Sequence, residues 1–422
     1  MLHAGRASGY EDSERSGPAV MTSTLKTNSA LVLTVGFLIL FVSGGARFAI
    51  GLTLRPMVEE FGWGRAELGS AVALFQIVSA ICMFLSGRLA DRISIRYLIA
   101  GGILVSAAGI AAMGAVSAPW HALLLYGVVF AIGNGVLSVT PIGVMVTRAF
   151  PGRAGLANGL AMSGLSIGQL VIVAALAAIL AAIGWRSVFL WLGIAHLLLL
   201  PVVLGGVPGR SNAAPMLSAP DEGHGVRAAA HTRQFWLLLA IYGICGFNDF
   251  FVSTHVVAFA QDRGVNAFLA GNLLALMGLT GLLGVVAAGA WSDRAGPVWA
   301  TAVAFAARIG AFALIALDQS PLSVTIFALV FGATFLVTAP LTVLFVRQSF
   351  GTRHLGALTG LITMVHHICG GFGAYLGARI FDRTGRYDIA FLLMLGSAIV
   401  ALVLTLSLSR RPATLVEYAG AE

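Results

Sequence analysis

Lysine is almost absent from this chain, because 24 of its 25 basic residues are arginine and Lys26 is the single lysine. A phosphate-binding loop of the G-x-x-x-x-G-K-[ST] type therefore cannot occur, which argues against ATP hydrolysis within this chain. Cysteine is also scarce. Cys82, Cys245 and Cys369 lie far apart inside apolar stretches, so their spacing fits neither a metal site nor a redox pair. We expect all three to be packing residues.

Charged residues are few as well. They make up 10% of the 422 residues, while 58% are hydrophobic; typical soluble domains carry about a quarter charged residues. The apolar residues come in blocks of about 20, the length that crosses a membrane as a helix, and they lack the strict alternation of membrane strands. We predict an all-α membrane protein with about twelve spans. The predicted spans are 30–58, 67–87, 97–117, 120–147, 154–182, 186–205, 234–260, 267–289, 297–317, 321–347, 354–379 and 388–409.

The formal charge of +8 could suggest a nucleic-acid partner, but most arginines stand singly at predicted helix ends. Arg and Lys number 16 on the side of the N-terminus and 7 on the other side, with Arg47 and Arg308 inside spans. Basic residues favour the cytoplasmic side, so we expect both termini in the cytoplasm and the protein in the inner membrane. The polar N-terminal segment lacks the apolar core of a signal peptide and is interpreted as a cytoplasmic tail.

The longest polar interruption has linker composition and divides the chain into halves that resemble each other. The segments Gly87–Arg92 and Gly289–Arg294 share a G-x-x-x-D-R pattern, and Pro141 and Pro340 each stand seven residues before an arginine. Such repeats predict two six-helix bundles with a binding site between them. The predicted parts are a tail over 1–29, a bundle over 30–206, a linker over 207–233, a bundle over 234–409 and a tail over 410–422.

The paired G-x-x-x-D-R loops resemble the signature of the major facilitator superfamily, and the resemblance covers Ala30 to Leu408. The segment Gly377–Phe391 and the Thr254-His255 pair are similar to the monocarboxylate-porter and oxalate/formate-antiporter branch. Two positions depart from it: eukaryotic monocarboxylate porters carry an Asp and an Arg where this chain has Gly281 and Val285. This chain therefore lacks the Asp–Arg pair to which the resemblance assigns proton coupling. The motifs of many drug/proton antiporters are missing too.

Three charged residues, Arg47, Asp249 and Arg308, lie well inside predicted spans and away from their ends. A charge at that depth costs roughly 2.5–3.5 kcal/mol on insertion scales. Arg47 lies in a span that lines the central cavity in the resembled fold, and its planar fork suits a carboxylate. Asp249 is the one carboxylate at the middle of a span. It is a candidate proton carrier and the expected partner of Arg47; the alternative is a carboxyl group that burial keeps neutral. Arg308 belongs to a helix that the resemblance makes peripheral, so a structural pair inside the second half is an alternative to a coupling role.

The remaining candidates are polar side chains inside spans and the repeated loops. A buried histidine can titrate or contact an anion, but it can equally be a satisfied interior residue. Aspartates that follow helix C-termini need neighbouring cations, so we predict the gate pairs Asp91–Arg148 and Asp293–Arg347. Substrate contacts are predicted for Arg47, Asn134, Asn248, His255 and His366, coupling roles for Asp249, His367 and Arg308, and gate roles for Gly87, Asp91, Arg92, Arg148, Gly289, Asp293, Arg294 and Arg347.

The sequence thus predicts a secondary transporter that moves a small organic anion, a monocarboxylate or dicarboxylate, by alternating access, with protons as the candidate coupling ion. A carrier of uncharged or cationic compounds is the alternative within the same class. A membrane-embedded enzyme lacks a catalytic constellation, and a receptor lacks a soluble output domain. We expect no catalytic residue, cofactor, metal or nucleic-acid partner, and a monomer in the lipid bilayer.

Overall fold

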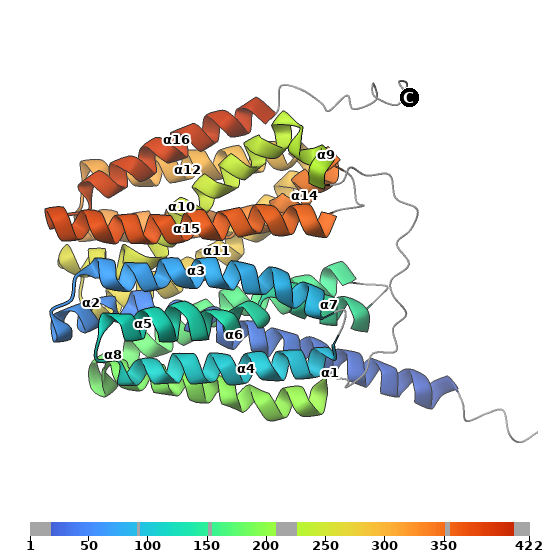
Figure 1. Ribbon diagram of the computed structural model, residues 1–422. Coiled ribbons are helices and arrows are strands. Elements are labelled where there is room, and N and C mark those ends of the chain that lie inside the picture. Colours follow the sequence, from blue (N-terminus) through green and yellow to red (C-terminus); the bar gives the residue numbers. More distant parts are fainter. Residues whose placement is uncertain (1–17, 91–92, 151–153, 208–225, 351–354, 409–422) are drawn as a thin grey trace, which may run out of the picture.

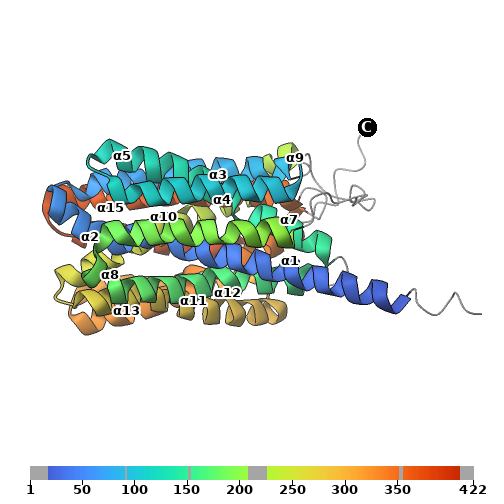
Figure 2. The same ribbon diagram turned by 90° about the horizontal axis from the view of Figure 1, so that it is seen from below.

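The computed structural model describes residues 18–90, 93–150, 154–207, 226–350 and 355–408, and every regular element among them is helical (Figure 1). The long helices run along one common axis, as the second view also shows (Figure 2). The elements are α1 (Pro18–Ala46), α2 (Ala49–Phe61), α3 (Arg65–Leu89), α4 (Ile95–Ala112), η1 (Met113–Ala115), α5 (Pro119–Leu124), η2 (Leu125–Phe130), α6 (Ala131–Val136), α7 (Val139–Ala149), α8 (Ala154–Gly206), α9 (Val226–Ala230), α10 (Arg233–Asp262), α11 (Ala267–Ala295), α12 (Pro297–Leu317), α13 (Pro321–Phe335), α14 (Thr338–Phe350), α15 (Leu355–Thr384) and α16 (Asp388–Leu408).

Ten apolar helical stretches in the described part of the chain are long enough to cross a membrane. One of them, Ala157–Gly206, has 50 residues and holds two crossings, because Gly184 breaks α8 with φ 73° and ψ 160°. Only glycine adopts that backbone conformation without strain. A further crossing consists of the short helices α13 and α14. The count is therefore twelve, and the prediction of an all-α protein with about twelve spans is confirmed.

Two crossings are interrupted at equivalent places. The break between α6 and α7 falls at Leu137–Ser138, and the break between α13 and α14 falls at Leu336–Val337. In each case a proline follows four residues after the leucine, Pro141 and Pro340. Proline has no N–H to donate to the carbonyl four residues earlier, so an α-helix loses a bond there. The repeated proline seen in the sequence thus accounts for a repeated helix break.

The first crossing is also interrupted, at Arg47–Phe48 between α1 and α2. No proline explains this break, since the one proline of α2 is Pro56, seven residues after its start. The hydroxyl of Tyr126 donates a hydrogen bond of 2.8 Å to the Arg47 carbonyl. It thereby satisfies a backbone acceptor at membrane depth, where an unpaired carbonyl is costly.

The helices up to α8 and those from α10 onward form two groups, which lie one above the other in Figure 1. Within the groups α1 packs against α8 and α10 against α15; between them α3 packs against α15 and α8 against α11. Close approach depends on small residues: a Cβ on Gly371 would lie 2.8 Å from the Ala73 carbonyl oxygen. The linker predicted over 207–233 stays a prediction, because 208–225 lie outside the described residues.

Candidate functional site

A cavity of about 200 Å³ lies between the two groups of helices. It starts at the level of Arg47 and extends toward the side on which α1 begins and α16 ends, here called the terminal side (on the right in Figure 1). Aromatic and aliphatic side chains make up much of its wall. The lining residues are Ser43, Gly44, Arg47, Phe48, Phe75, Gln76, Ser79, Met83, Asn134, Gly135, Leu137, Ser138, Val139, Leu165, Gln169, Tyr242, Asp249, Phe250, Phe335, Leu336, Thr338, Thr342, Thr363, His366 and His367.

Arg47 occupies the break between α1 and α2, near the middle of the 33-residue crossing Ser29–Phe61. Its guanidinium carbon lies 5.2 Å from the ring centre of Phe48 and 5.4 Å from that of Phe250. These are cation–π contacts. Within the described residues the guanidinium has neither an ion pair nor a hydrogen bond. A permanently charged, forked donor is therefore available to a ligand in the cavity.

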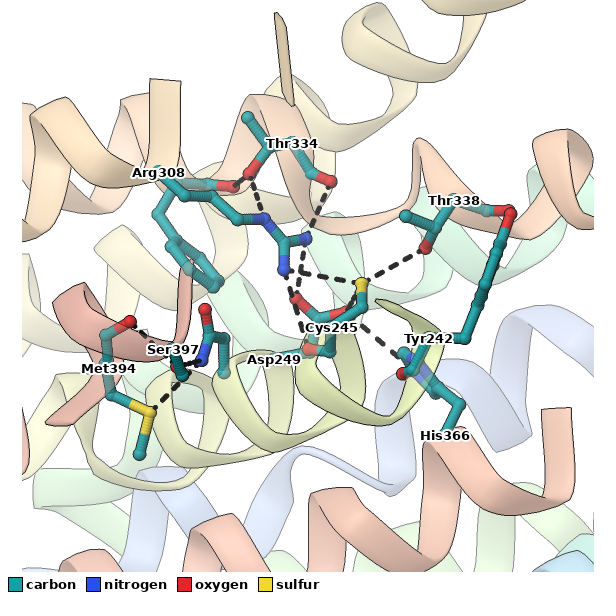
Figure 3. A network of polar contacts seen from close by, with 11 residues as sticks. Tyr242, Cys245, Asp249, Arg308, Thr334, Thr338, His366, Met394 and Ser397 are labelled. Carbon is teal, nitrogen blue, oxygen red and sulfur yellow. Dashed lines mark hydrogen bonds and ion pairs between the residues drawn. The ribbon is translucent and has the colours of Figure 1, made fainter. Parts of the chain in front are cut away.

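Asp249 and Arg308 form a buried ion pair, with 2.8 Å between Oδ1 and Nη2 (Figure 3). Both side chains are almost fully buried, 3% and 1% exposed. Arg308 also donates to the Thr334 hydroxyl through Nε and to the Thr334 carbonyl through Nη2, each at 3.0 Å. That carbonyl belongs to the last turn of α13, where helical partners are missing and the dipole favours a cation. Arg308 thus ties α10, α12 and α13 together.

This pairing corrects one expectation. We predicted that Asp249 would be the partner of Arg47, but its partner is Arg308. The alternative considered for Arg308, a pair within the second half, is what the structure contains. Asp249 pairs with Arg308, so Arg47 has no ion-pair partner in the described part of the chain.

The second oxygen of Asp249 faces a thiol and an imidazole. Cys245 Sγ donates to Oδ2 at 3.3 Å, and His366 Nε2 lies 3.8 Å from the same oxygen. The other ring nitrogen of His366, Nδ1, lies 3.1 Å from the Tyr242 carbonyl and must carry a proton to bond it. A second proton on this ring would therefore point at Asp249. Cys245, Asp249 and His366 have metal-like spacing, but the guanidinium of Arg308 on the same carboxylate opposes a metal cation.

Two more predicted residues border the cavity and two do not. His367 lines it with Nδ1 on the Thr363 carbonyl at 2.9 Å, and Asn134 lines it with a long bond of 3.5 Å to the Ser43 carbonyl. By contrast, Asn248 faces α16, where it donates to Ser397 Oγ at 2.9 Å.

His255 also lies outside the cavity lining. Its Nε2 donates to the Ala374 carbonyl at 2.8 Å, and its Nδ1 accepts from the Tyr387 hydroxyl at 3.0 Å. Both ring nitrogens are satisfied, so this histidine holds α10 against α15 and the start of α16. Neither Asn248 nor His255 is placed to contact a ligand in the cavity.

The sequence analysis missed two amides in the cavity wall, Gln76 on α3 and Gln169 on α8. Gln169 donates to the Leu274 carbonyl at 3.0 Å. Gln76 is 2% exposed and its Oε1 has no hydrogen-bond partner. An uncharged amide in a span carries a smaller membrane penalty than a charge, so the filter that found Arg47 passed over it. A search for all polar residues in α3 could have found it.

The predicted gate is only partly within the described residues. Asp91 and Arg92 lie outside them, and the side chain of Asp293 does too. Arg148 Nη1 donates to the Ala90 carbonyl at 3.2 Å, which brings it to the end of α3. The pairs Asp91–Arg148 and Asp293–Arg347 stay predictions. Of the remaining gate residues, Arg347 is exposed, and Arg294 donates to the Ala290 carbonyl of its own helix. A Cβ on Gly87 would lie 3.0 Å from Thr140, whereas a Cβ on Gly289 would meet nothing within 4 Å.

The side opposite the termini is closed by contacts between the two halves. The carboxylate of Asp382 accepts the backbone N–H groups of Arg65 and Ala66, each at 2.8 Å, and so caps the first turn of α3 from the other half. The Arg65 side chain pairs with Asp262 at 2.8 Å and donates to the Tyr387 hydroxyl at 2.9 Å. One residue of α3 is therefore bound by α10, α15 and the turn before α16.

The fold and this arrangement agree with a comparison of sequences. A model of the Major Facilitator Superfamily matches residues 36–374, most of the chain. The chain belongs to the Major Facilitator Superfamily. The superfamily consists of transporters, so this protein is a multi-pass membrane transporter and not an enzyme, as predicted.

Relatives within the superfamily are distant. The chain is 25% identical to the uncharacterized MFS-type transporter YcxA of Bacillus subtilis over 81% of this chain and 87% of that one. It is 26% identical to monocarboxylate transporter 13 of Rattus norvegicus, over 85% and 79%. The resemblance to the monocarboxylate branch is thereby confirmed.

Solved structures of other superfamily members share the fold. A mutant of the nucleoside transporter NupG superposes with a TM-score of 0.76 at 13% identity, covering 90% of this chain and 99% of that one. A D-xylose-proton symporter gives 0.72 at 17% identity, covering 89% and 96%. At these identities the likeness establishes the fold of this superfamily member and nothing about its substrate.

Removing the Asp382 cap should open the closed side. We expect Asp382→Ala to destabilise the closed state by about 1–2 kcal/mol relative to the open state. The ratio of closed to open molecules should then fall roughly five- to thirtyfold. Spin labels at Glu59 and Ala267 would report this by pulsed electron resonance as growth of a longer distance, after replacement of the accessible Cys82 and Cys369 by serine.

The matched control is Arg186→Ala, because the Arg186–Glu60 ion pair lies within the first half. It should leave the distance distribution unchanged. Equal distributions in the parent and in Asp382→Ala would show that this carboxylate does not hold the closed side.

Proposed function

We propose that this transporter carries a small organic anion with a single carboxylate by alternating access, with Arg47 as the anchor of the carboxylate. The observation that supports this most strongly is the unpaired guanidinium at mid-membrane depth in the cavity wall. A charge there is costly unless something compensates it. An anionic substrate supplies the compensation, and the planar fork binds a carboxylate through two parallel hydrogen bonds.

The number of cations favours a monocarboxylate over a dicarboxylate. Arg47 is the one arginine among the residues that line the cavity. Arg308 lies behind Asp249 and is neutralised by it. A second carboxylate would meet the walls formed by Phe75, Phe250 and Phe335, where its desolvation would go uncompensated. An uncharged substrate would leave Arg47 unpaired.

The names of the relatives also support a monocarboxylate substrate. Several are monocarboxylate transporters, at about one quarter identity over most of both chains. The branch's usual charged pair is absent here, since its positions are Gly281 and Val285, and a Cβ on Gly281 would lie 3.2 Å from the Gly332 carbonyl oxygen. This position serves helix packing. Any coupling group must therefore lie elsewhere.

Proton coupling, in this proposal, runs through Asp249 and His366. His366 faces Asp249 at 3.8 Å, borders the cavity and packs against His367, while Arg308 and Arg47 are the nearby cations. A bound carboxylate on Arg47 offsets the repulsion that an imidazolium on His366 would otherwise meet. Substrate binding and proton uptake thus favour each other.

The setting of the protein is also part of the proposal. The excess of arginine and lysine on one side of the spans supports a cytoplasmic-membrane protein with both termini in the cytoplasm. We also propose that it acts as a monomer. In that orientation the closed side of the molecule faces outward, and the cavity extends toward the cytoplasm.

Arg47 variants test the anchor. Arg47→Ala removes two charge-assisted hydrogen bonds of roughly 1.5–3 kcal/mol each, so affinity for a bound monocarboxylate should fall about 100-fold or more. Arg47→Lys keeps the charge but loses the fork, so a loss of about tenfold with residual transport is expected. The measurement is calorimetric titration of purified protein with a panel of organic acids. Undiminished affinity in Arg47→Ala would move the anchor elsewhere and favour an uncharged or cationic substrate.

Variants of the ion pair test the coupling. Asp249→Asn leaves Arg308 buried without a counter-charge, which should destabilise the protein by about 3–5 kcal/mol and lower its melting temperature. The double variant Asp249→Asn, Arg308→Gln removes both charges and should regain much of that stability. In liposomes it should exchange substrate across the membrane but fail to accumulate it under a proton gradient. Accumulation at the parent's level by the folded double variant would show that Asp249 is not needed for coupling.

A further inference from the structure

A second, smaller cavity adjoins the first at Arg47. It has a volume of about 20 Å³ and lies on the side of Arg47 away from the termini. Five residues border both cavities and so form the partition between them: Arg47, Phe48, Phe75, Gln76 and Phe250. The recess adds Ile50, Gly51, Val72, Tyr126, Ser253 and Thr254 to its wall. A space of this size holds one group as small as a water molecule or a hydroxyl.

Among the side chains of the partition, Gln76 carries the one hydrogen-bond acceptor, and within the described residues this acceptor has no partner. Its side chain is 2% exposed, its Oε1 is buried without a hydrogen bond, and it borders both the recess and the cavity. The other cavity glutamine, Gln169, has a backbone partner at Leu274. Buried polar atoms are nearly always paired. Neither the Arg47 guanidinium nor any other described group donates to this oxygen, so it is an acceptor open to a donor on a ligand.

We infer that Gln76 is a specificity-determining residue, and that the substrate is a 2-hydroxy monocarboxylate with a bulky apolar body. This rests on the proposed function, since Arg47 holds the carboxylate. The fork of Arg47 satisfies both carboxylate oxygens. A carboxylate has only acceptors and cannot pair with Gln76 Oε1, whereas a hydroxyl on the neighbouring carbon donates to it.

The lining of the larger cavity indicates the chemistry of the rest of the substrate. About 200 Å³ is more space than a two- or three-carbon acid fills, and the rings of Phe48, Phe75, Phe250 and Phe335 border it. A branched or aromatic body buries its apolar surface there. An ammonium group in place of the hydroxyl would lie beside the Arg47 guanidinium and be repelled by it, so amino acids are disfavoured.

The experiment compares acids that differ only in the hydroxyl: mandelate with phenylacetate, and 3-phenyllactate with 3-phenylpropionate. Calorimetric titration of the purified full-length parent should show the hydroxy acid of each pair bound at least tenfold more tightly. Gln76→Met keeps the length and removes the polar atoms, so it should weaken the two hydroxy acids about tenfold or more and leave the two deoxy acids within about twofold.

Gln169→Met is the matched control, because it removes the same group type from the same cavity, and it should keep the preference for the hydroxyl. Equal affinities within each pair in the parent, or a Gln76→Met variant that weakens all four acids alike, would overturn the inference. Arg47→Ala separates the two proposals. If it abolishes binding of all four acids while the parent shows no hydroxyl preference, the anchor stands and the role of Gln76 falls. If none of the four binds the parent but another monocarboxylate of the panel does, the inference of a bulky 2-hydroxy acid falls; if no organic acid of the panel binds, the proposed function itself falls.

Discussion

The buried ion pair between Asp249 and Arg308 determines the electrostatics of the cavity. It neutralises the carboxylate at the middle of α10 and places its cation on the end of α13, where freed carbonyls and the helix dipole favour a positive charge. Because this carboxylate pairs with Arg308, Arg47 contacts two aromatic rings and has no ion-pair partner among the described residues. The selectivity proposed for an anion follows from that difference between the two arginines.

The same ion pair links the wall of the proposed substrate site to the interrupted crossing formed by α13 and α14. Arg308 donates two hydrogen bonds to Thr334, just before the break between α13 and α14. Leu336 and Thr338 at that break line the cavity. The break between α6 and α7 lines the opposite wall, and both follow from prolines at repeated positions. Interrupted helices expose backbone only where protein or a cavity covers it. The proposed binding site thus lies where the crossings are interrupted.

Alternating access requires contacts that hold one side closed and can be exchanged. The capping of α3 by Asp382 and the bonds of Arg65 to Asp262 and Tyr387 are polar and lie at helix ends. They can be replaced by water when the two halves move apart, unlike a packed apolar interface. Glycines such as Gly371 let the helices meet closely without adding a large apolar surface that would resist separation.

Much of the fold followed from simple physical patterns in the sequence. Blocks of apolar residues predicted the twelve crossings, and the repeated prolines Pro141 and Pro340 indicated two related halves. The helix breaks that accompany these prolines were not predicted. The charge filter also found Arg47, Asp249 and Arg308.

Pairing could not be predicted, because it depends on how helices rotate and pack: Asp249 binds Arg308 instead of Arg47. Asn248 and His255 share a helix with Asp249 but point to other neighbours, Ser397 and Ala374. Gln76 carries no charge and so gave no signal in a search for costly residues. Its proposed role depends on a missing hydrogen-bond partner, which the sequence alone does not show.

The most direct test of this account is a structure of the purified protein determined with an organic monocarboxylate bound. The account predicts the ligand in the cavity between the two halves, with its carboxylate oxygens about 2.7–2.9 Å from the guanidinium nitrogens of Arg47, and the Asp249–Arg308 pair intact. A carboxylate bound to any other group, with the Arg47 guanidinium still resting on Phe48 and Phe250, would contradict it.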